Sequence, residues 1–498
     1  MRDLKAVAPG EMTNTPRQRH PRGLFRLFFT EMWERFSFYG MRALLVLFMV
    51  DSIKKGGMGL DDKSATAIYG IYTGLVYLAA LPGGWVADRF LGARQAVWYG
   101  GLVIAAGHFV LALPWTQTFY IGLGLVVVGT GLLKPNVSAM VGQLYSSDDA
   151  RRDAGFTIFY MGINLGATLG PLVCSGLGEN INWHYGFLAA GVGMVAGLIQ
   201  YRLAVTQLSH VGLPPERASG DDGRVRMGFV LLAVIILILG VLAEAGVIHI
   251  DPVAIARVLS SAIAFLGLFY FAWIFAFGGL SPSEKKRVGL ILILFLTSAL
   301  FWAGFEQAGS SFNLFAERYT RREVNWPGLA VVPAGWYQSL GPVFVILLAP
   351  VMAALWLKLG RANREPSIPV KFGWALLLLA LGFLVMAGAA QVVSSGVKVG
   401  AGWLVSTYLL HTIGELCLSP VGLSSVTKLA PARLVGGMMG AWFLATSLGN
   451  VIAGQMAGLL GDETSRMAGR YLAFASAPAL IGVALLLCAP RIRRWVEA

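Results

Sequence analysis

The sequence predicts an all-α polytopic membrane protein, and its composition and the length of its apolar runs support that prediction. Hydrophobic residues make up 56% of the 498 residues, charged residues only 13%, and the mean hydropathy is +0.67. Soluble globular domains carry about a quarter charged residues. Because a transmembrane helix needs roughly 20 mainly apolar residues, the chain has room for a dozen or more spans. It has no room for a large soluble domain.

Apolar runs separated by short polar breaks indicate fourteen transmembrane helices. They are expected at residues 24–50, 66–87, 96–115, 119–143, 154–178, 184–205, 227–248, 256–278, 288–315, 335–357, 370–392, 401–427, 436–460 and 470–489. A polar stretch, SHVGLPPERASGDDGR, separates the first six helices from the next two. The predicted order is therefore six helices, two helices and six helices.

This order divides the chain into six parts with a defined orientation. The parts are an N-terminal cytoplasmic tail (1–23), an N-terminal six-helix bundle (24–205), a cytoplasmic linker (206–226), two additional transmembrane helices (227–280), a C-terminal six-helix bundle (281–490) and a cytoplasmic tail (491–498). With the N-terminus inside, about 26 of the Lys and Arg residues fall on the cytoplasmic side and about 10 outside. Both termini are therefore expected in the cytoplasm, and no cleaved signal peptide is expected.

The net charge of +13 fits this topology and attraction to anionic lipid of the inner leaflet. Nucleic acid is not an expected partner. Cys174, Cys417 and Cys488 lie in or beside spans without metal-ligand spacing, and the histidines are scattered, so no metal site is expected. The chain has neither a P-loop nor a GxSxG motif. ATP hydrolysis and nucleophilic catalysis are therefore not expected, and no catalytic residue is assigned.

Several ionisable residues fall inside the apolar runs. Each costs about 2.5 to 3.5 kcal/mol at the bilayer centre, so each needs a partner, a wet cavity or a function. They are Glu31, Glu34, Arg35, Arg42, Lys134, Glu306 and Glu415. The first four belong to one segment, EMWERFSFYGMR, and on a helical wheel Glu31, Arg35 and Arg42 fall within an arc of about 40°. The first helix therefore carries one polar stripe.

An ion pair within the first helix explains only part of this polar stripe. Glu31 and Arg35 form an i,i+4 pair in the favourable order, which would neutralise itself inside a bundle. Glu34 and Arg42 remain unexplained by that pair. Lys134, next to Pro135, needs an anion from another helix or from a ligand.

The charges of the two bundles complement each other. The N-terminal bundle holds two acids and three bases in its spans, whereas the C-terminal bundle holds two acids, Glu306 and Glu415. A site between the bundles would be positive on one wall and negative on the other, which suits a zwitterion. Because apolar surroundings favour the neutral form of a carboxyl group, these acids are also candidates to carry protons.

Two segments show a family resemblance. GGWVADRFLGARQ resembles the cytoplasmic loop motif of the major facilitator superfamily, and the resemblance implies a gating and packing role for Asp88, Arg89 and Arg94, with Gly92 in the motif. EMWERFSFYGMR resembles the ExxERF segment on the first helix of proton-coupled oligopeptide transporters.

Two further segments, FYMGINLG and GELCLSPVGLS, resemble other signatures of the same family. The resemblance covers about residues 20 to 490. The two helices between the bundles are similar to those of bacterial members, which implies a bacterial inner membrane.

The resemblance implies a major facilitator fold and a transport function. Two six-helix bundles plus two intervening helices would import di- and tripeptides by alternating access, driven by the proton gradient. The implied partners are peptides, protons and membrane lipid. No cofactor other than the coupling proton is implied, and a monomer is expected to be functional.

The resemblance also implies roles for individual residues. Arg42 and Lys134 would face the peptide carboxylate, and Glu415 and Asn164 would receive the amino terminus. The aromatic positions of the substrate site are Tyr39, Tyr77, Trp302 and Trp442, with Tyr160 as a further candidate. Proton coupling is assigned to Glu31, Glu34, Arg35 and Glu306.

A gating hypothesis follows from these roles. Glu306 is expected to pair with Arg42 when the outward side is closed. Lys134 is expected to pair with Glu415 when the inward side is closed. Protonation or peptide binding would break a pair and so shift the balance between the two states.

Three positions depart from the family pattern. Phe38 stands where many relatives have a second tyrosine, Gly70 where animal members have a histidine, and Gly341 where many relatives have an asparagine. Without the histidine at position 70, proton coupling should rest on carboxylates. Without the asparagine at position 341, the family pattern does not define how the peptide amino terminus is bound.

Two alternatives remain. One is a carrier of the same fold for another charged solute, such as nitrate or a drug. The other is a membrane-embedded enzyme that uses the buried carboxylates as acid and base. The acidic and basic walls favour a substrate with two opposite termini, and the missing nucleophile and metal motifs argue against an enzyme.

Overall fold

The computed structural model describes residues 20–146, 149, 151–208, 211–214, 251–327, 329–461 and 463–497. Its N-terminal bundle consists of α1 (Arg22–Val50), α2 (Asp62–Val86), α3 (Ala93–Leu111), α4 (Thr116–Gln143), α5 (Arg152–Asn180) and α6 (Trp183–Ala204). Helix α8 (Pro252–Phe277) follows. The C-terminal bundle consists of α9 (Pro282–Phe305), α10 (Ser311–Tyr319), α11 (Leu340–Arg361), α12 (Ile368–Val393), α13 (Gly402–Leu429), α14 (Val435–Gly458) and α15 (Thr464–Glu497).

The expected all-α membrane architecture is confirmed. Thirteen of the expected spans coincide with described helices, and the span expected at 227–248 lies outside the described residues. Eleven of the described helical segments are long and apolar enough to cross a membrane. Helix α1 is not among them, because its stripe of charges interrupts every long apolar window.

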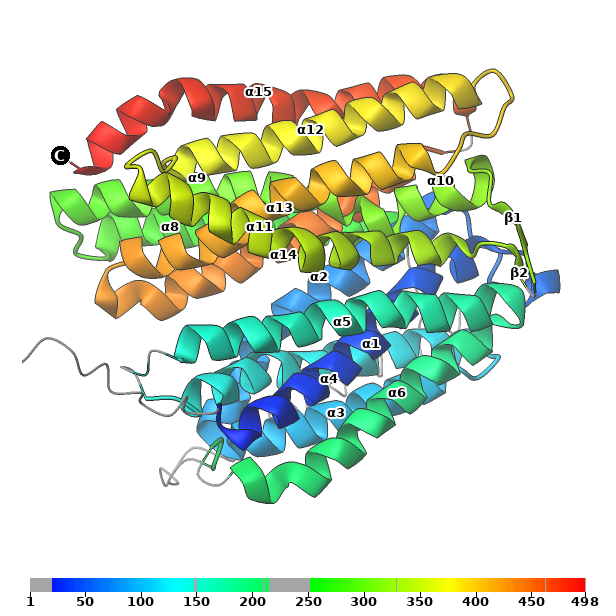
Figure 1. Cartoon of the computed structure of the whole chain (residues 1–498), viewed down its shortest axis with the longest axis horizontal. Coiled ribbons are helices and arrows are strands. Elements are labelled where there is room, and N and C mark those ends of the chain that lie inside the picture. Colours follow the sequence, from blue (N-terminus) through cyan, green and yellow to red (C-terminus); the bar gives the residue numbers. More distant parts are fainter. Residues whose placement is uncertain are drawn as a thin grey trace, which may run out of the picture.

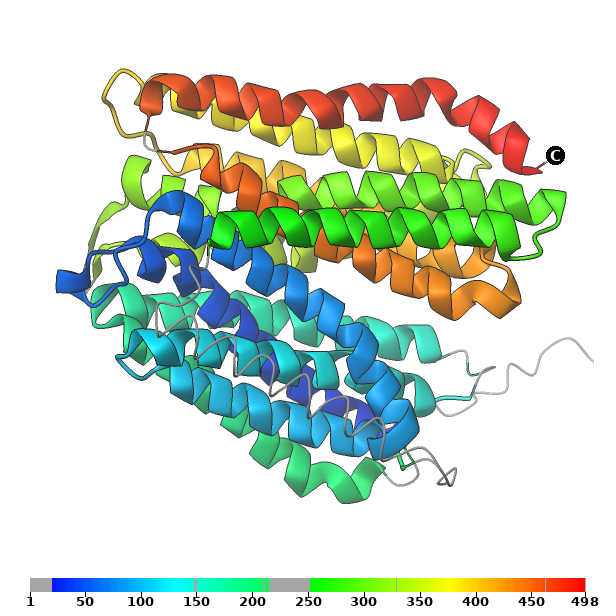
Figure 2. The same cartoon turned by 180° about the vertical axis from the view of Figure 1, so that it is seen from behind.

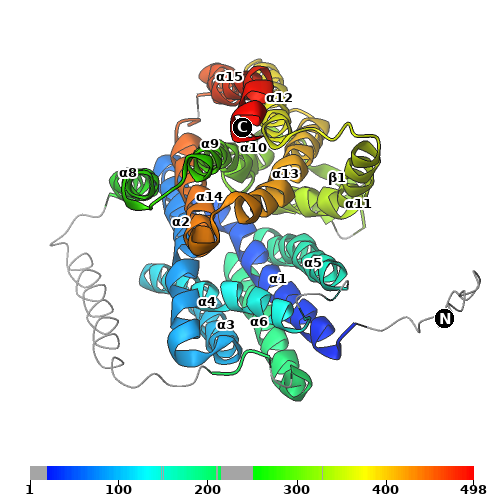
Figure 3. The same ribbon diagram turned by 90° about the vertical axis from the view of Figure 1, so that its left-hand side faces the viewer.

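The two bundles pack side by side with their helices roughly aligned (Figure 1). Helix α8 lies against α2 and α14, outside both bundles, both in the view from behind (Figure 2) and in the view along the helices (Figure 3). The amide of Gln455 on α14 holds it there, because Nε2 donates to Ala256 O at 3.2 Å and to Ser260 Oγ at 2.9 Å. This helix therefore braces the line along which the bundles meet.

A short β-hairpin marks one end of the molecule. Strands β1 (Glu323–Trp326) and β2 (Leu329–Val331) pair antiparallel between α10 and α11. We call this the hairpin end, and we call the opposite end, where α1 begins and α15 ends, the terminus end (Figure 1).

The ninth expected span is broken in the structure. Helix α9 ends at Phe305, a 3-10 turn follows over Glu306–Gly309, and α10 continues after it. Gln307 ties this turn to α14, because its Nε2 donates to Ala453 O at 3.1 Å. Ser311 Oγ donates to Gln307 Oε1 at 2.6 Å. These side-chain contacts support the break and bring Glu306 to the face opposite α1.

Helix α15 extends past residue 490, where the sequence analysis places the end of the C-terminal bundle. It continues through Pro490 to Glu497. The ring of Trp495 packs so closely on α9 that a Cβ at Gly289 would lie 2.7 Å from it. This contact gives the last turns a tertiary partner, so they remain helical.

Helices α2 and α14 approach each other at glycines. A Cβ at Gly70 would lie 2.9 Å from Gly454 Cα, so neither position has room for a side chain. Nearby, Ser447 Oγ donates to Gly74 O at 2.8 Å. Small residues and side-chain hydrogen bonds of this kind hold membrane helices together where the hydrophobic effect does not.

Candidate functional site

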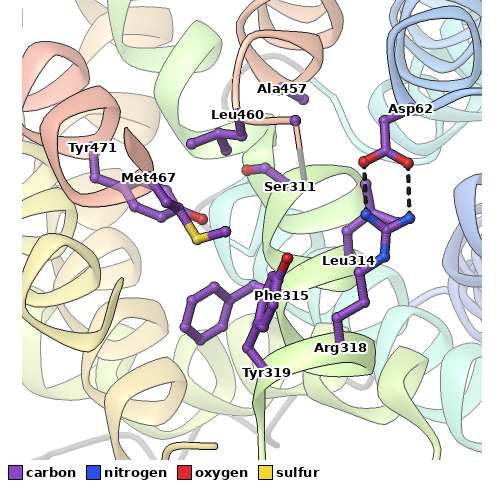
Figure 4. Close-up of a pocket in the computed structure, with 11 residues that line it drawn as sticks. Asp62, Ser311, Leu314, Phe315, Arg318, Tyr319, Ala457, Leu460, Met467 and Tyr471 are labelled. Carbon is purple, nitrogen blue, oxygen red and sulfur yellow. Dashed lines mark hydrogen bonds and ion pairs between the residues drawn. The ribbon is translucent and has the colours of Figure 1, made fainter. Parts of the chain in front are cut away.

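Polar contacts between the two bundles gather at the hairpin end. Asp62 at the start of α2 receives two hydrogen bonds of 2.7 Å from the guanidinium of Arg318 on α10. This pair borders a small cavity of about 20 Å³ that is also lined by Ser311 and Tyr471 (Figure 4). The carboxylate and the guanidinium lie in parallel, so the pair joins the bundles in a defined orientation.

A second carboxylate, Glu179 at the end of α5, also crosses between the bundles at this end. It accepts from Ala334 N at 2.6 Å and from Gly335 N at 2.8 Å, at the turn that precedes α11. Arg322 Nη1 lies 3.5 Å from Glu179 Oε2. The hairpin end is therefore closed by contacts from α10, from Arg322 just after it, and from the turn that precedes α11.

Glu31, Glu34 and Arg35 form one buried group on α1. Arg35 Nε lies 3.2 Å from Glu31 Oε1 and also contacts Glu34 Oε2. All three side chains are almost completely buried. The predicted i,i+4 pair is present, and the adjacent carboxylate shares the same guanidinium. One guanidinium thus contacts two carboxylates in this group.

Arg42 pairs across the bundles. Its Nη2 lies 2.6 Å from Glu306 Oε2, and its Nε donates to Tyr69 OH at 2.6 Å. The guanidinium also lies 5.5 Å from the centre of the Tyr39 ring. Glu306 lies in the break between α9 and α10. This break in the C-terminal bundle therefore positions the partner of Arg42 on α1.

Lys134 and Glu415 are not paired with each other in this structure. Lys134 Nζ lies 3.8 Å from the centre of the Tyr77 ring and within electrostatic range of Glu31 and Glu34. Glu415 lies within electrostatic range of Glu306. Neither Lys134 nor Glu415 forms an ion pair with a described residue, and both are only half-buried.

Asn164 and Tyr160 lie on α5. The Asn164 amide donates to Tyr160 O at 2.9 Å, one turn earlier in the same helix. Tyr160 is exposed and lies within electrostatic range of Glu415 and Tyr39. The two candidates thus lie one turn apart on α5, and Tyr160 is the one within electrostatic range of Glu415.

The two candidate tryptophans have different surroundings. Trp302 is half-buried on α9, and its Cβ packs against Gly449 of α14. Trp442 is buried and fills the space beside Gly422 on α13, where no side chain would fit. Its ring also lies 6.5 Å from that of Phe372. Trp442 thus packs within its own bundle in this structure.

Asp88, Arg89 and Arg94 lie apart from this set. They follow α2 at the terminus end, in and after a π-helical turn. Arg94 Nη2 donates to Val211 O at 2.8 Å, and Gly92 has φ +74°. A Cβ there would lie 2.6 Å from the backbone of Pro214. The motif therefore fastens residues 211–214 to the N-terminal bundle.

The departures from the family pattern have different structural consequences. Phe38 lies against the Arg35 guanidinium, 5.2 Å from Cζ to the ring centre. Gly70 cannot take a side chain because α14 is too close. Gly341 is different, since the nearest atom to a Cβ there would be Thr412 Oγ1 at 3.9 Å.

Sequence reasoning did not find several residues of this arrangement. Tyr69, Asp62, Arg318 and Glu179 all contact the other bundle or a residue that does. Three of them are charges at helix ends, where charge is ordinary, so they gave no signal. Tyr69 is one aromatic residue among many in an apolar helix.

The described residues contain no group of three or more His, Cys, Asp and Glu side chains that could hold a metal ion. Cys174 and Cys417 are buried, and Cys488 is exposed.

Two helical bundles that meet at a charged interface are the architecture of membrane transporters of the major facilitator type. The comparisons agree and go further. Residues 94–472 match the family model described as POT family. The chain belongs to the POT family, as the sequence resemblance predicted.

Similar proteins cover nearly the whole chain. It is 44% identical to the peptide transporter YePEPT of Yersinia enterocolitica subsp. palearctica, over 97% of this chain and 98% of that one. It is 38% identical to a di-/tripeptide transporter of Lactococcus lactis subsp. cremoris, over 88% and 89%. A crystal structure of the peptide transporter POT in complex with sulfate superposes with a TM-score of 0.89, at 40% identity over 96% of each chain.

Proposed function

We propose that this protein imports di- and tripeptides together with protons by alternating access across the bacterial inner membrane. The observation that carries the proposal is the ion pair between Arg42 on the N-terminal bundle and Glu306 on the C-terminal bundle. A charge pair across an interface that must open and close links protonation to bundle movement. The relatives named as peptide transporters support the substrate class.

The charges around this pair suit a zwitterionic peptide. Arg42 and Lys134 provide the positive wall for the carboxylate, and Glu415 with Asn164 provides the acceptors for the amino terminus. Tyr39 lies beside Arg42 and Tyr77 beside Lys134, and with Trp302 and Tyr160 they would contact the peptide backbone and side chains. For Trp442 we propose only a supporting role, because its ring packs inside the C-terminal bundle.

Proton coupling involves the carboxylates. We assign it to Glu306 and to the Arg35 group, which consists of Glu31, Glu34 and Arg35. Within the described residues, Glu31 Oε2 and Glu34 Oε1 accept no hydrogen bond, so either oxygen can take a proton while Arg35 keeps its other contacts. Protonation of Glu306 would remove the charge that holds Arg42. The proton is the coupling ion, and the proposed cycle uses no cofactor.

The orientation follows from basic residues at the terminus end. Lys285, Arg287, Arg361 and Arg491 all belong to that end, so the positive-inside rule places it in the cytoplasm. The closed hairpin end then faces outward, and the Arg42–Glu306 pair belongs to the outward-closed state. One chain provides both walls of the site, which supports function as a monomer.

Transport of labelled dialanine into liposomes tests this function. An imposed inward proton gradient should drive accumulation, and an uncoupler should abolish it. Liposomes without protein provide the control. A protein that exchanges dialanine without uncoupler-sensitive accumulation would contradict proton coupling. A protein that moves a different charged solute and no peptide would favour the alternative carrier.

A further inference from the structure

A groove of about 470 Å³ opens at the terminus end of the C-terminal bundle, between the start of α12 and the end of α15. It is lined by Ser367, Val370, Leu486, Ala489, Pro490, Arg493 and Arg494. Figure 3 views this end and shows the C-terminus beside α12, on the side of the molecule away from the N-terminal bundle. The groove is therefore separate from the site between the bundles.

The groove combines two kinds of lining. Arg493 and Arg494 are exposed and supply positive charge. Val370 and Leu486 belong to its apolar part. Ser367 is the N-cap residue of α12, yet its hydroxyl makes no capping hydrogen bond. A ligand with an anionic head and an apolar body matches this lining.

The surroundings place the groove at the boundary between membrane and water. Along α15, the side chains of Leu480 and Leu487 are 72% and 73% exposed, as expected for a surface that faces lipid tails. The exposed Arg491 and the partly exposed Trp495 follow immediately after this apolar run. Basic residues and tryptophan at the end of a span are typical of the headgroup region.

The local charge favours an anion. Arg361 and Arg364 precede α12 and are exposed, and they add to the two arginines of the groove. The nearby carboxylate of Glu365 is paired with Lys371, whose Nζ lies 2.6 Å from Glu365 Oε1. An anionic headgroup at the groove would therefore meet a positive field.

We propose that this groove binds an anionic phospholipid of the leaflet at the terminus end. Arg493 and Arg494 bind the headgroup phosphate, and an acyl chain lies along Leu486 and Val370 toward the exposed apolar face of α15. Arginine suits this role because its planar guanidinium binds phosphate oxygens in pairs. The proposal does not depend on which solute the protein transports.

Native mass spectrometry of the full-length protein in detergent tests the proposal. Phosphatidylglycerol and phosphatidylcholine with the same acyl chains are the probes. The wild type should retain phosphatidylglycerol in preference to phosphatidylcholine. In the double variant Arg493→Gln/Arg494→Gln, apparent affinity for phosphatidylglycerol should fall about tenfold, with phosphatidylcholine binding unchanged.

A matched variant separates the groove from general attraction. Lys285→Gln/Arg287→Gln removes the same charge from exposed positions at the same end of the same bundle, outside the groove. Its affinity for phosphatidylglycerol should change by less than about twofold. The variant Arg493→Lys/Arg494→Lys keeps the charge and should retain more binding than the Gln variant.

Three results would overturn the proposal. The first is equal loss of phosphatidylglycerol in the groove variant and the matched variant, because attraction would then be diffuse. The second is a wild type that does not distinguish the two lipids. The third is displacement of phosphatidylglycerol by an equal concentration of inorganic phosphate, because the groove would then recognise the free anion alone.

Discussion

Two arginines on α1 share one chemistry and have different kinds of partner. Arg35 binds Glu31 and Glu34 of its own helix. Arg42, about two turns further on, binds Glu306 of the other bundle. Both guanidinium groups are buried, and both satisfy a charge that would otherwise be costly in a membrane.

The two ion pairs respond differently when the bundles move apart. A pair within one helix moves as a unit, so it can hold a proton but cannot register the separation of the bundles. A pair between bundles is present only when the bundles approach at that point. We infer that the group of Glu31, Glu34 and Arg35 binds the proton. The Arg42–Glu306 pair then links protonation to the separation of the bundles at the hairpin end.

Arg42→Ala should impair transport more than any other change proposed here. This change leaves Glu306 without its buried partner, which costs about 3–5 kcal/mol for a broken buried pair, and it also removes the proposed peptide carboxylate site. Both gradient-driven uptake and exchange of dialanine should be lost. Arg466→Ala, at a largely exposed residue of α15, is the control and should transport normally. Normal exchange in Arg42→Ala would remove Arg42 from the site.

Glu34→Gln should separate the two arginines functionally. The change leaves Arg35 paired with Glu31 but removes one titratable carboxylate from the group. Gradient-driven accumulation of dialanine should be abolished, while exchange at equal concentrations continues at a reduced rate. A variant that still concentrates peptide would show that Glu34 does not couple protons.

Gly454→Ala should weaken the closed hairpin end without touching a charge. A Cβ at this position would lie 2.3 Å from Thr66 O and 2.8 Å from Gly70 Cα, so α2 and α14 must separate. Overpacking of this kind costs about 1–3 kcal/mol, and both melting temperature and uptake should fall. Gly341→Ala is the matched control, because its nearest neighbour is 3.9 Å away. Equal effects in the two variants would contradict this role of the glycine contact.

Arg318→Gln should have the smallest effect. Its pair with Asp62 also joins the bundles, but the arginine side chain is 28% exposed, and pairs that reach solvent contribute about 0–1 kcal/mol. The rate of dialanine uptake should fall by less than about fivefold. Loss as complete as in Arg42→Ala would mean that the main lock lies at the surface rather than at Glu306.

The sequence predicted the parts of this account that depend on the cost of charge in lipid. Glu31, Arg35, Arg42 and Glu306 stood out because apolar runs surround them, and one segment of the family resemblance, EMWERFSFYGMR, holds the first three. The pairing of Arg42 with Glu306 could be stated only as a hypothesis, since it depends on the break between α9 and α10.

Other features could not be predicted because their cause is tertiary. Tyr69 has no local signal, and its role arises from the direction in which Arg42 extends. Trp442 matched an aromatic position of the family, yet the space beside Gly422 buries its ring inside one bundle. The closeness of α2 and α14 explains Gly70 only after Gly454 is seen beside it.

A distance measurement across the hairpin end can separate the roles of Glu306 and Glu31 in closing it. Spin labels at Lys55→Cys and Lys398→Cys, two exposed positions on different bundles, would be placed in a Cys488→Ser background, because the other two cysteines are buried. Glu306→Gln should populate a longer distance in double electron–electron resonance, whereas Glu31→Gln should leave the distribution unchanged. An unchanged distribution in Glu306→Gln, or equal opening in both variants, would contradict the assignment of the gate to the pair between the bundles.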